Sequence, residues 1–526
     1  MKRLALLLIA VVMVVTVTAC GGDKVVIDEN IELSSYPIKT EATLTYWLPL
    51  DSNLTTSVSN FGETEYAKEL EKRTGVKVEY IHPAAGQQTE ALSVMIAADE
   101  LTDLVQSNWV NGYSGGPGKA IDDEVIISLN EYMDDYAPAL STILAQNPDA
   151  ARSVRTDDGD YYVFPLLKLD DKLRSSEGPV LRADWLKECG LEVPETIDEW
   201  ENVLRVLKKE KNLSAPMSFN YSSFIYKFVN MFGINLGQFV KDGVVTYGPL
   251  EPDYKEGIAR IHSWYKEGLL DKNIASVDSK MIDSHILNEN TAASIMTGGS
   301  GIGKYIVSSG IEGFDLVAAK MPGKVKGENS TQQFLSASYS ASNSVAISVR
   351  CKNPALAVKY LDYNYTDEGK MLANFGIEGV SYEMVDGYPK YTELITNNPE
   401  GKSMSQMMPL YFRSSTAGGP FLQDVRYIEQ YYATPQQKHA LEVWPLKKEN
   451  SGIEAVPALT PSAEEYEEYA NIMASVNKYS QEMLIKFITG VEPLDKFDEY
   501  TERLKSLKVE RAMEIQQAAY NRYKNR

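Results

Sequence analysis

The chain is poor in cysteine and histidine, with three and four of them among 526 residues. Three cysteines are too few for a disulfide framework, so we expect Cys189 and Cys351 to be unbridged and to fill apolar space. The histidines lie far apart in the sequence, and none has a partner at metal-ligand spacing. No zinc or EF-hand pattern is present either. We therefore expect neither a metal ion nor another cofactor.

Positive charge is also scarce, because 52 Lys and Arg face 73 Asp and Glu and give a net charge of −21. Such an acidic surface repels phosphate backbones, so nucleic acid is not expected as a partner. Beyond the first 17 residues, the chain has no apolar run long enough to span a membrane. A single core stops growing near about 250 to 300 residues, so this length predicts two lobes.

The single long apolar run opens the chain. Two basic residues precede residues 4–17, which are fewer than the about 20 that a spanning helix needs. The sequence Val-Thr-Ala-Cys-Gly at 17–21 resembles a lipobox, in which cleavage before Cys20 leaves a thiol that carries a diacylglycerol. We interpret residues 1–19 as a lipoprotein signal peptide and Cys20 as an anchor on the outer face of the membrane. An ordinary cleavage site beside a chance cysteine is the alternative.

Strand and helix patterns alternate along the rest of the chain. Residues 20–40 have no period and suit a flexible stalk. Strands are then expected at 43–48, 76–81, 104–106, 180–182, 216–219, 292–296 and 315–319. Helices are expected at 63–74, 89–98, 184–189, 222–232, 254–267, 353–361, 462–488 and 494–523. A capping box at Thr196 and Glu199 predicts one more helix, which carries Trp200, Val203 and Leu207. Strands separated by helices predict an α/β fold with a mixed, mainly parallel sheet in each lobe.

Residues 298–304 match the first seven positions of a P-loop, but the match then fails. Tyr305 stands where the motif requires Ser or Thr, whose hydroxyl binds Mg²⁺, so a nucleotide site is not expected. Small residues at a strand-to-helix turn can still leave the backbone N–H groups of Gly299 and Ser300 open to a ligand. A plain tight turn is the equally supported alternative.

Aromatic residues are abundant, with 32 Tyr and 6 Trp. Trp47 with Asp51, and Trp109, lie at the carboxyl ends of predicted parallel strands, where open α/β sheets bind ligands. An aromatic ring can stack on the apolar face of a sugar while polar groups match its hydroxyls. Three other tryptophans fall on helices at apolar spacing and are assigned to the core: Trp185, Trp200 and Trp264.

Several segments together resemble the family 1 extracellular solute-binding proteins, the lipoprotein receptors of bacterial carbohydrate ABC importers. The most specific match is Leu-Arg-Ala-Asp-Trp-Leu at 181–186 followed by Pro-Glu-Thr-Ile-Asp-Glu-Trp at 194–200. Weaker matches are the lipobox and residues 45–47, 97–103, 353–369 and 376–379. Residues 97–103 resemble the family's Gly-Asp-x-Pro-Asp element, in which Thr102 replaces the proline.

The resemblance implies a two-lobed periplasmic-binding-protein-like fold of type II, with the ligand in a cleft between the lobes. It places residues 41–161 and 341–398 in lobe 1, and residues 162–340 and 399–526 in lobe 2. Ligand contacts to both lobes would favour hinge closure. It also implies a monomer that is not an enzyme. The implied partners are a carbohydrate, an oligosaccharide in particular, and the permease subunits of an ABC importer.

The residues expected to bind this ligand come from both lobes: Trp47, Asp51 and Trp109 from lobe 1, and Arg182, Tyr221, Thr297, Gly299 and Ser300 from lobe 2. The two tryptophans would stack on sugar rings, and Asp51 would accept hydrogen bonds from hydroxyls. Arg182 would donate a fork that also suits a uronate carboxylate, with a structural ion pair to Asp184 as the alternative. No catalytic residue is predicted. A surface glycan hydrolase and a non-transport sugar sensor or adhesin stay open as other functions.

Overall fold

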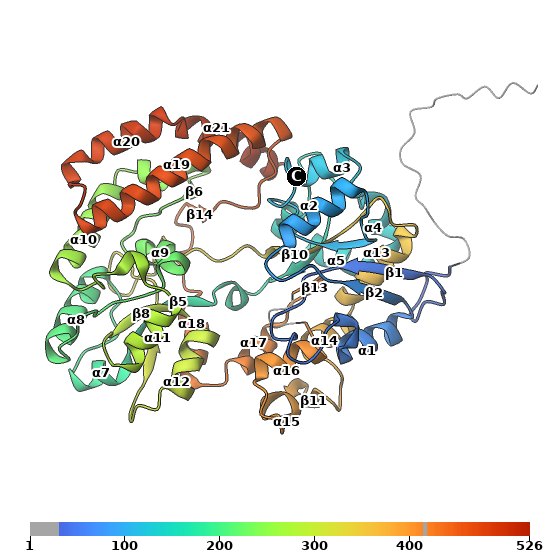
Figure 1. Ribbon diagram of the computed structural model, residues 1–526, viewed down its shortest axis with the longest axis horizontal. Coiled ribbons are helices and arrows are strands. Elements are labelled where there is room, and N and C mark those ends of the chain that lie inside the picture. The colour runs from blue at the N-terminus through green and yellow to red at the C-terminus, as the bar shows by residue number, and fades with distance from the viewer. Residues whose placement is uncertain (1–30, 414–417) are drawn as a thin grey trace, which may run out of the picture.

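The structure is a computed structural model that describes residues 31–413 and 418–526. The predicted signal peptide, Cys20 and the first part of the predicted stalk lie outside the described residues. Within the described part of the chain, no helix is both long and apolar enough to cross a bilayer. Figure 1 shows two lobes side by side, one with β1 and β2 and the other with β5 and β8. We call them lobe 1 and lobe 2.

Lobe 1 is built on a six-stranded mixed sheet of order β13-β4-β10-β3-β1-β2. Its strands are β1 (Thr43–Trp47), β2 (Lys77–Ile81), β3 (Leu104–Gln106), β4 (Phe164–Leu167), β10 (Tyr339–Ile347) and β13 (Phe421–Leu422). β1 runs parallel to β2 and β3, whereas β10 is antiparallel to β3 and β4. β11 (Tyr382–Val385) and β12 (Tyr388–Tyr391) form a separate hairpin.

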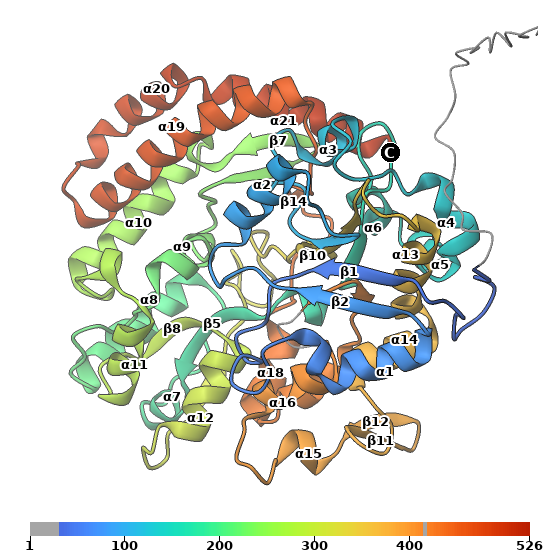
Figure 2. The same ribbon diagram turned by 45° about the vertical axis from the view of Figure 1, so that its right-hand side comes forward.

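The helices of lobe 1 cover both faces of this sheet (Figure 2). They are α1 (Glu65–Thr74), α2 (Gln88–Ala98), α3 (Gly116–Asp122), α4 (Asn130–Tyr136), α5 (Pro138–Gln146), α6 (Pro148–Ser153), α13 (Pro354–Asp362), α14 (Asp367–Phe375), α15 (Glu393–Thr396), α16 (Met404–Tyr411) and α17 (Val425–Tyr431). α1 and α2 alternate with β1, β2 and β3 as the sequence predicts, whereas α3 to α6 follow one another without a strand between them.

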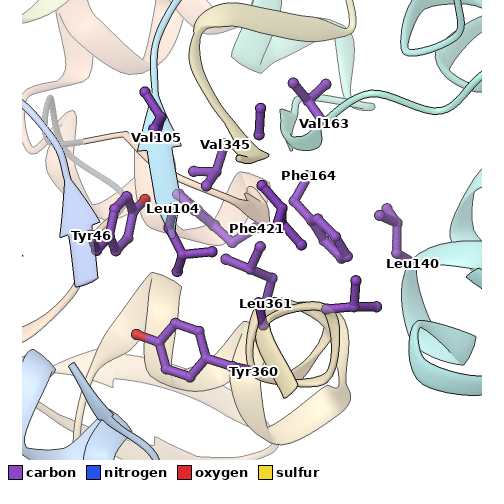
Figure 3. Close-up of a cluster of buried hydrophobic side chains, with 14 of the residues drawn as sticks. Tyr46, Leu104, Val105, Leu140, Val163, Phe164, Val345, Tyr360, Leu361 and Phe421 are labelled. Carbon is purple, nitrogen blue, oxygen red and sulfur yellow. The ribbon is translucent and has the colours of Figure 1, made fainter. Parts of the chain in front are cut away.

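The core of lobe 1 joins strands that are far apart in the sequence. Leu104, Phe164, Val345 and Phe421 are fully buried in one cluster (Figure 3). Phe164 lies on β4 and Phe421 on β13, two strands that the predicted boundaries at 161 and 398 assign to lobe 2. Their pairing in the six-stranded sheet places them in lobe 1 instead. The chain leaves this lobe only after each of these strands ends.

Lobe 2 is built on a three-stranded sheet of order β8-β5-β9, and it carries a smaller sheet of order β14-β6-β7. The strands are β5 (Glu177–Arg182), β6 (Gln238–Lys241), β7 (Val244–Tyr247), β8 (Ala293–Thr297), β9 (Leu316–Ala318) and β14 (Ile453–Ala455). The helices are α7 (Ala183–Glu188), α8 (Ile197–Glu210), α9 (Tyr221–Asn230), α10 (Tyr254–Glu267), α11 (Ser279–Leu287), α12 (Lys304–Ser308), α18 (Pro435–Val443), α19 (Ala463–Thr489), α20 (Phe497–Ser506) and α21 (Val509–Lys524).

The main sheet of lobe 2 is not parallel, in contrast to the expectation. β5 runs antiparallel to both β8 and β9. The physical reason is that β5 follows a segment arriving from lobe 1, so the strand starts at the side facing lobe 1. Glu177 at the start of β5 therefore lies beside Thr297 at the end of β8. The carboxyl end of β5 points away from lobe 1.

Local signals place several elements as predicted. Thr196 and Glu199 form a capping box at the start of α8, with Thr196 Oγ1 accepting from the Glu199 N–H at 3.3 Å. The helical tryptophans are core residues as predicted, with Trp200 and Trp264 fully buried. The predicted helix at 494–523 is instead two helices, α20 and α21. They are separated at Lys508, whose φ of 67° is incompatible with a continuous helix.

The C-terminal helices connect the two lobes. α19 packs against α10 and α21 on lobe 2, and Gln517 of α21 accepts a hydrogen bond from the Val245 N–H at 2.7 Å. The end of the chain reaches lobe 1, where the Asp157 carboxylate accepts from Arg522 and from Arg526. We call this contact the C-terminal strap.

Candidate ligand-binding cleft

A cavity of about 500 Å³ lies where the chain passes between the lobes. The first crossing, from β4 to β5, runs beside the one that leads from β9 to β10. Lys168 N–H donates to the Ser338 carbonyl at 2.7 Å, and Ser336 N–H donates to the Arg174 carbonyl at 2.9 Å. A third crossing joins α17 to α18. The lining residues are Lys168, Lys172, Leu173, Arg174, Ser175, Ser176, Glu177, Lys227, Phe334, Leu335, Ser336, Gln423, Tyr427, Ile428 and Tyr432.

Several charged side chains line this cavity, which we call the crossing cavity. Lys172 pairs with Glu442 at 2.7 Å, and Arg174 pairs with Asp171 at 3.0 Å. Burial lowers the pKa of the Lys168 amine, since removing water disfavours its charged form. Burial also lowers the pKa of Lys227, although Glu177 opposes this shift. The pKa of Glu177 is raised, again by burial, with Lys227 as the opposing charge.

A second cavity, of about 350 Å³, extends from the crossing cavity into lobe 2. Glu177, Lys227 and Phe334 line both. The remaining walls are largely amides and hydroxyls, together with the ring of Tyr226, whose residue surface is 51% exposed. They come from Ser223, Tyr226, Asn230, Asn235, Gln238, Ala455 and Val456. Amide groups beside an open aromatic ring are suited to a ligand with hydroxyls on an apolar frame.

A third cavity, also of about 350 Å³, lies in lobe 1 at the carboxyl ends of β1 and β3. Trp47 and Asp51 both line it, so two of the predicted ligand residues are brought together there. The Trp47 residue is only 2% exposed, so it presents little of its ring. The Asp51 Oδ1 accepts a hydrogen bond from the Asn53 N–H at 2.7 Å. Polar neighbours in the wall include Gln88, Thr89, Gln106, Ser107, Asn108, Ser342 and Asn343.

Two predicted ligand residues are structural instead. Trp109 is 1% exposed, and its Nε1 donates to the Val105 carbonyl at 3.3 Å, so its ring belongs to the lobe 1 core. Arg182 is 2% exposed and pairs with Asp184 and Glu289. Its guanidinium also stacks on Trp185 at 3.8 Å. The alternative of a structural ion pair is therefore the one observed. Arg182 ends β5, about 16 Å along the strand from Glu177 at the cleft.

Tyr221 lines a separate cavity of about 330 Å³ between α9 and α19. That cavity shares Tyr226 with the lobe 2 cavity, so the two adjoin. The role of Tyr221 in ligand binding stays a prediction.

The glycine run forms a π-helical turn, Gly298–Gly303, that packs against the third crossing. A Cβ on Gly298 would lie 2.4 Å from ring atoms of Tyr432, so only glycine allows this approach. The Gly298 carbonyl accepts from Gln437 Nε2 at 2.9 Å. Thr297 Oγ1 and Ser300 Oγ lie 2.7 Å apart, and Gly299 faces the Tyr431 ring. This packing supports the tight-turn interpretation, and ligand contacts by these three residues stay predictions.

Sequence reasoning missed Lys168, Glu177, Lys227 and Phe334, which line the cavities at the crossings. Lys227 occupies one position of an amphipathic helix, α9, and nothing in its neighbourhood distinguishes it from a solvated lysine. Among residues 31–413 and 418–526, no group of three or more His, Cys, Asp or Glu is placed to hold a metal ion. Cys189 and Cys351 are free, as predicted.

Comparisons with known proteins agree with this architecture. Lipoprotein LipO of Bacillus subtilis is 22% identical over 353 residues, which span 63% of this chain and 66% of LipO. The fructooligosaccharide ABC transporter substrate-binding protein FusA of Streptococcus pneumoniae is 24% identical and covers 96% of this chain and 95% of its own.

A crystal structure of FusA in complex with kestose has a TM-score of 0.69 at 21% identity, with 92% of this chain and all of FusA covered. The alginate-binding protein AlgQ2 gives a TM-score of 0.70 at 23% identity, over 91% of this chain and 98% of AlgQ2. At these identities the structures show a shared two-lobed α/β fold.

The comparison with protein-family models assigns the chain to a family. The model of the bacterial extracellular solute-binding protein family matches residues 62–371, which include the whole first crossing and most of the strands of both lobes. With two lobes, repeated crossings and cavities between them, this chain belongs to the family of bacterial extracellular solute-binding proteins.

Proposed function

We propose that this protein captures an oligosaccharide between its lobes and delivers it to the permease of an ABC importer. The observation that carries the proposal is the crossing cavity, whose wall comes from both lobes. Gln423 and Tyr427 belong to lobe 1, whereas Lys227 belongs to lobe 2. A ligand that contacts both walls stabilises the closed arrangement over an open one. The permease would then bind the closed form.

Family relatives support a carbohydrate as the ligand. FusA is described as a fructooligosaccharide substrate-binding protein, and AlgQ2 as an alginate-binding protein. The cleft of this chain offers matching chemistry, since Tyr226 presents an open ring beside Asn235 and Gln238. The neighbouring cavities are each within the range of about 300 to 1,000 Å³ that is typical of small-molecule sites.

Isothermal titration calorimetry against a panel of neutral and acidic oligosaccharides tests this function directly. At least one member should bind, with a negative heat-capacity change from burial of its apolar faces. The complex should then be incubated and the saccharide recovered, because a receptor returns it intact. A panel without any binder would contradict the proposal. Cleavage of a bound saccharide would favour the glycan hydrolase.

The membrane anchor is part of the same proposal. We infer that a diacylglycerol on Cys20 holds the protein on the outer face of the membrane, and LipO, a relative, is described as a lipoprotein. The Cys20→Ser variant should move from the membrane fraction to the soluble extracytoplasmic fraction. Retention of that variant in the membrane would argue against lipid anchoring through this residue.

A further inference from the structure

The crossing cavity contains two amines without a partner. Among the described residues, neither Lys168 Nζ nor Lys227 Nζ has an ion pair or a hydrogen bond, whereas the other two cations of the wall are paired. Lys172 binds Glu442 at 2.7 Å, and Arg174 binds Asp171 at 3.0 Å and the Ser336 carbonyl at 2.7 Å. The unpaired amines thus stand out against paired neighbours in the same cavity.

The charge of this wall differs in sign from that of the whole protein. Among its residues, Glu177 is the carboxylate, and it interacts electrostatically with Lys227 without forming an ion pair with either amine. Glu177 therefore offsets at most one of the two positive charges. The complete chain carries a net charge of −21, which repels anions at long range. The crossing cavity is therefore locally positive although the protein as a whole is acidic.

Both amines are also partly removed from water. Lys168 and Lys227 are half-buried, and burial lowers the pKa of each amine. Removing a charge from water without providing a partner costs free energy, and an anion bound beside the amines would offset that cost. Next to Lys227, Asn230 Nδ2 donates to the Gln332 carbonyl at 3.2 Å, while its buried Oδ1 has no hydrogen-bond partner among the described residues. The two amines and the Asn230 amide oxygen therefore lack hydrogen-bond partners among the described residues.

We propose that the ligand is an acidic oligosaccharide, whose carboxylate or sulfate lies between the amines of Lys168 and Lys227. This inference rests on the proposed function and specifies its substrate class. Lys168 follows β4 of lobe 1 and Lys227 lies on α9 of lobe 2, so the anion would connect the lobes. The acidic group would thereby stabilise the closed form, while Tyr226 and the amides of the lobe 2 cavity bind the neighbouring sugar units.

Matched pairs of saccharides test this inference with the full-length chain. Oligogalacturonides and alginate oligosaccharides are compared with their carboxyl-reduced products, and sulfated oligosaccharides with their desulfated products. Within a pair, only the charge differs. We expect an acidic member to bind at least tenfold more tightly than its neutral counterpart, a difference of about 1.4 kcal/mol. High salt should weaken the binding of the acidic member alone, because salt screens the attraction between its charge and the two amines.

Variants assign the effect to the two amines. Lys168→Met and Lys227→Met should each weaken binding of the acidic member about tenfold, and weaken binding of the neutral member by a clearly smaller factor. Lys187→Met, an exposed lysine on α7, is the matched control and should change neither. Melting curves check that each variant folds, and Lys168→Gln or Lys227→Gln replaces the methionine variant at the same position if that one does not.

Two results would overturn the inference while the proposed function stands: a neutral member that binds as tightly as its acidic partner, or acidic binding that is insensitive to both substitutions. If no saccharide binds at all, the proposed function fails, and the inference fails with it.

Discussion

The C-terminal strap provides a sharp prediction about stability. The Asp157 carboxylate accepts from Arg526 Nε at 3.0 Å, and it also accepts from Arg522. The Arg526 side chain is 1% exposed and that of Asp157 is 15% exposed, so the pair is shielded from water. Asp157→Asn preserves the size of the side chain and removes its charge. It leaves a buried guanidinium without a counter-charge.

The expected cost follows from this geometry. Breaking a buried pair by removing one partner costs about 3 to 5 kcal/mol. Arg526 keeps the carbonyls of Arg152 and Arg155, at 3.2 and 2.6 Å, as acceptors. We therefore expect the lower end of the range, about 3 kcal/mol of unfolding free energy. Urea unfolding measures this loss, and hydrogen exchange should show that protection falls first in α21.

A matched control is available nearby. Asp149 pairs with Arg152 on α6, and its side chain is 85% exposed. Exposed pairs contribute about 0 to 1 kcal/mol, so Asp149→Asn should cost well under 1 kcal/mol. If Asp157→Asn and Asp149→Asn destabilise the protein equally, the argument that burial gives the strap its strength is refuted.

Three further predictions concern Arg182, Asp362 and Tyr226. Arg182→Met should lower the unfolding free energy by about 3 kcal/mol, because Asp184 loses its partner, and leave saccharide affinity within about twofold in calorimetry. Burial raises the pKa of Asp362 from 3.8 to about 6, so its stabilising contribution is complete below pH 4 and lost as the pH rises through 6. Relative to Asp362→Asn, the unfolding free energy should fall by about 3 kcal/mol between pH 4 and 7, and a constant difference would contradict this. Tyr226→Ala should weaken saccharide binding about two- to tenfold with little change in melting temperature, because its ring is half exposed; unchanged affinity would remove this ring from the site.

The sequence predicts best what local chemistry decides. The capping box at Thr196 and Glu199 starts α8 where it was expected, since its hydrogen bonds lie within one turn. Lys508 shows the limit of periodicity, because the apolar spacing continues through a residue whose backbone is left-handed. Residues 216–219 likewise have a strand pattern but make only isolated bridges at Met217.

Which residues line the site depends on strand direction and on contacts between segments far apart in the sequence, and no local pattern contains these. Arg182 was expected at the cleft, but it ends β5, and the antiparallel direction of this strand places Glu177 at the cleft instead. Trp109 does follow β3, but its ring turns into the core. Lys168 and Lys227 come together only because separate crossings and α9 meet at one cavity. Trp47 ends β1 and Asp51 follows it, so the correctly predicted direction of this strand brings both to one cavity, and their contacts with a ligand stay predictions.

The central claim is that a saccharide bound between the lobes holds them closed. Small-angle X-ray scattering of the protein, with and without a saccharide shown by calorimetry to bind, tests it most directly. We predict a smaller radius of gyration at saturation, reversed when the saccharide is removed. Superimposable scattering curves at full occupancy would contradict the claim, since the ligand would then bind without changing the arrangement of the lobes.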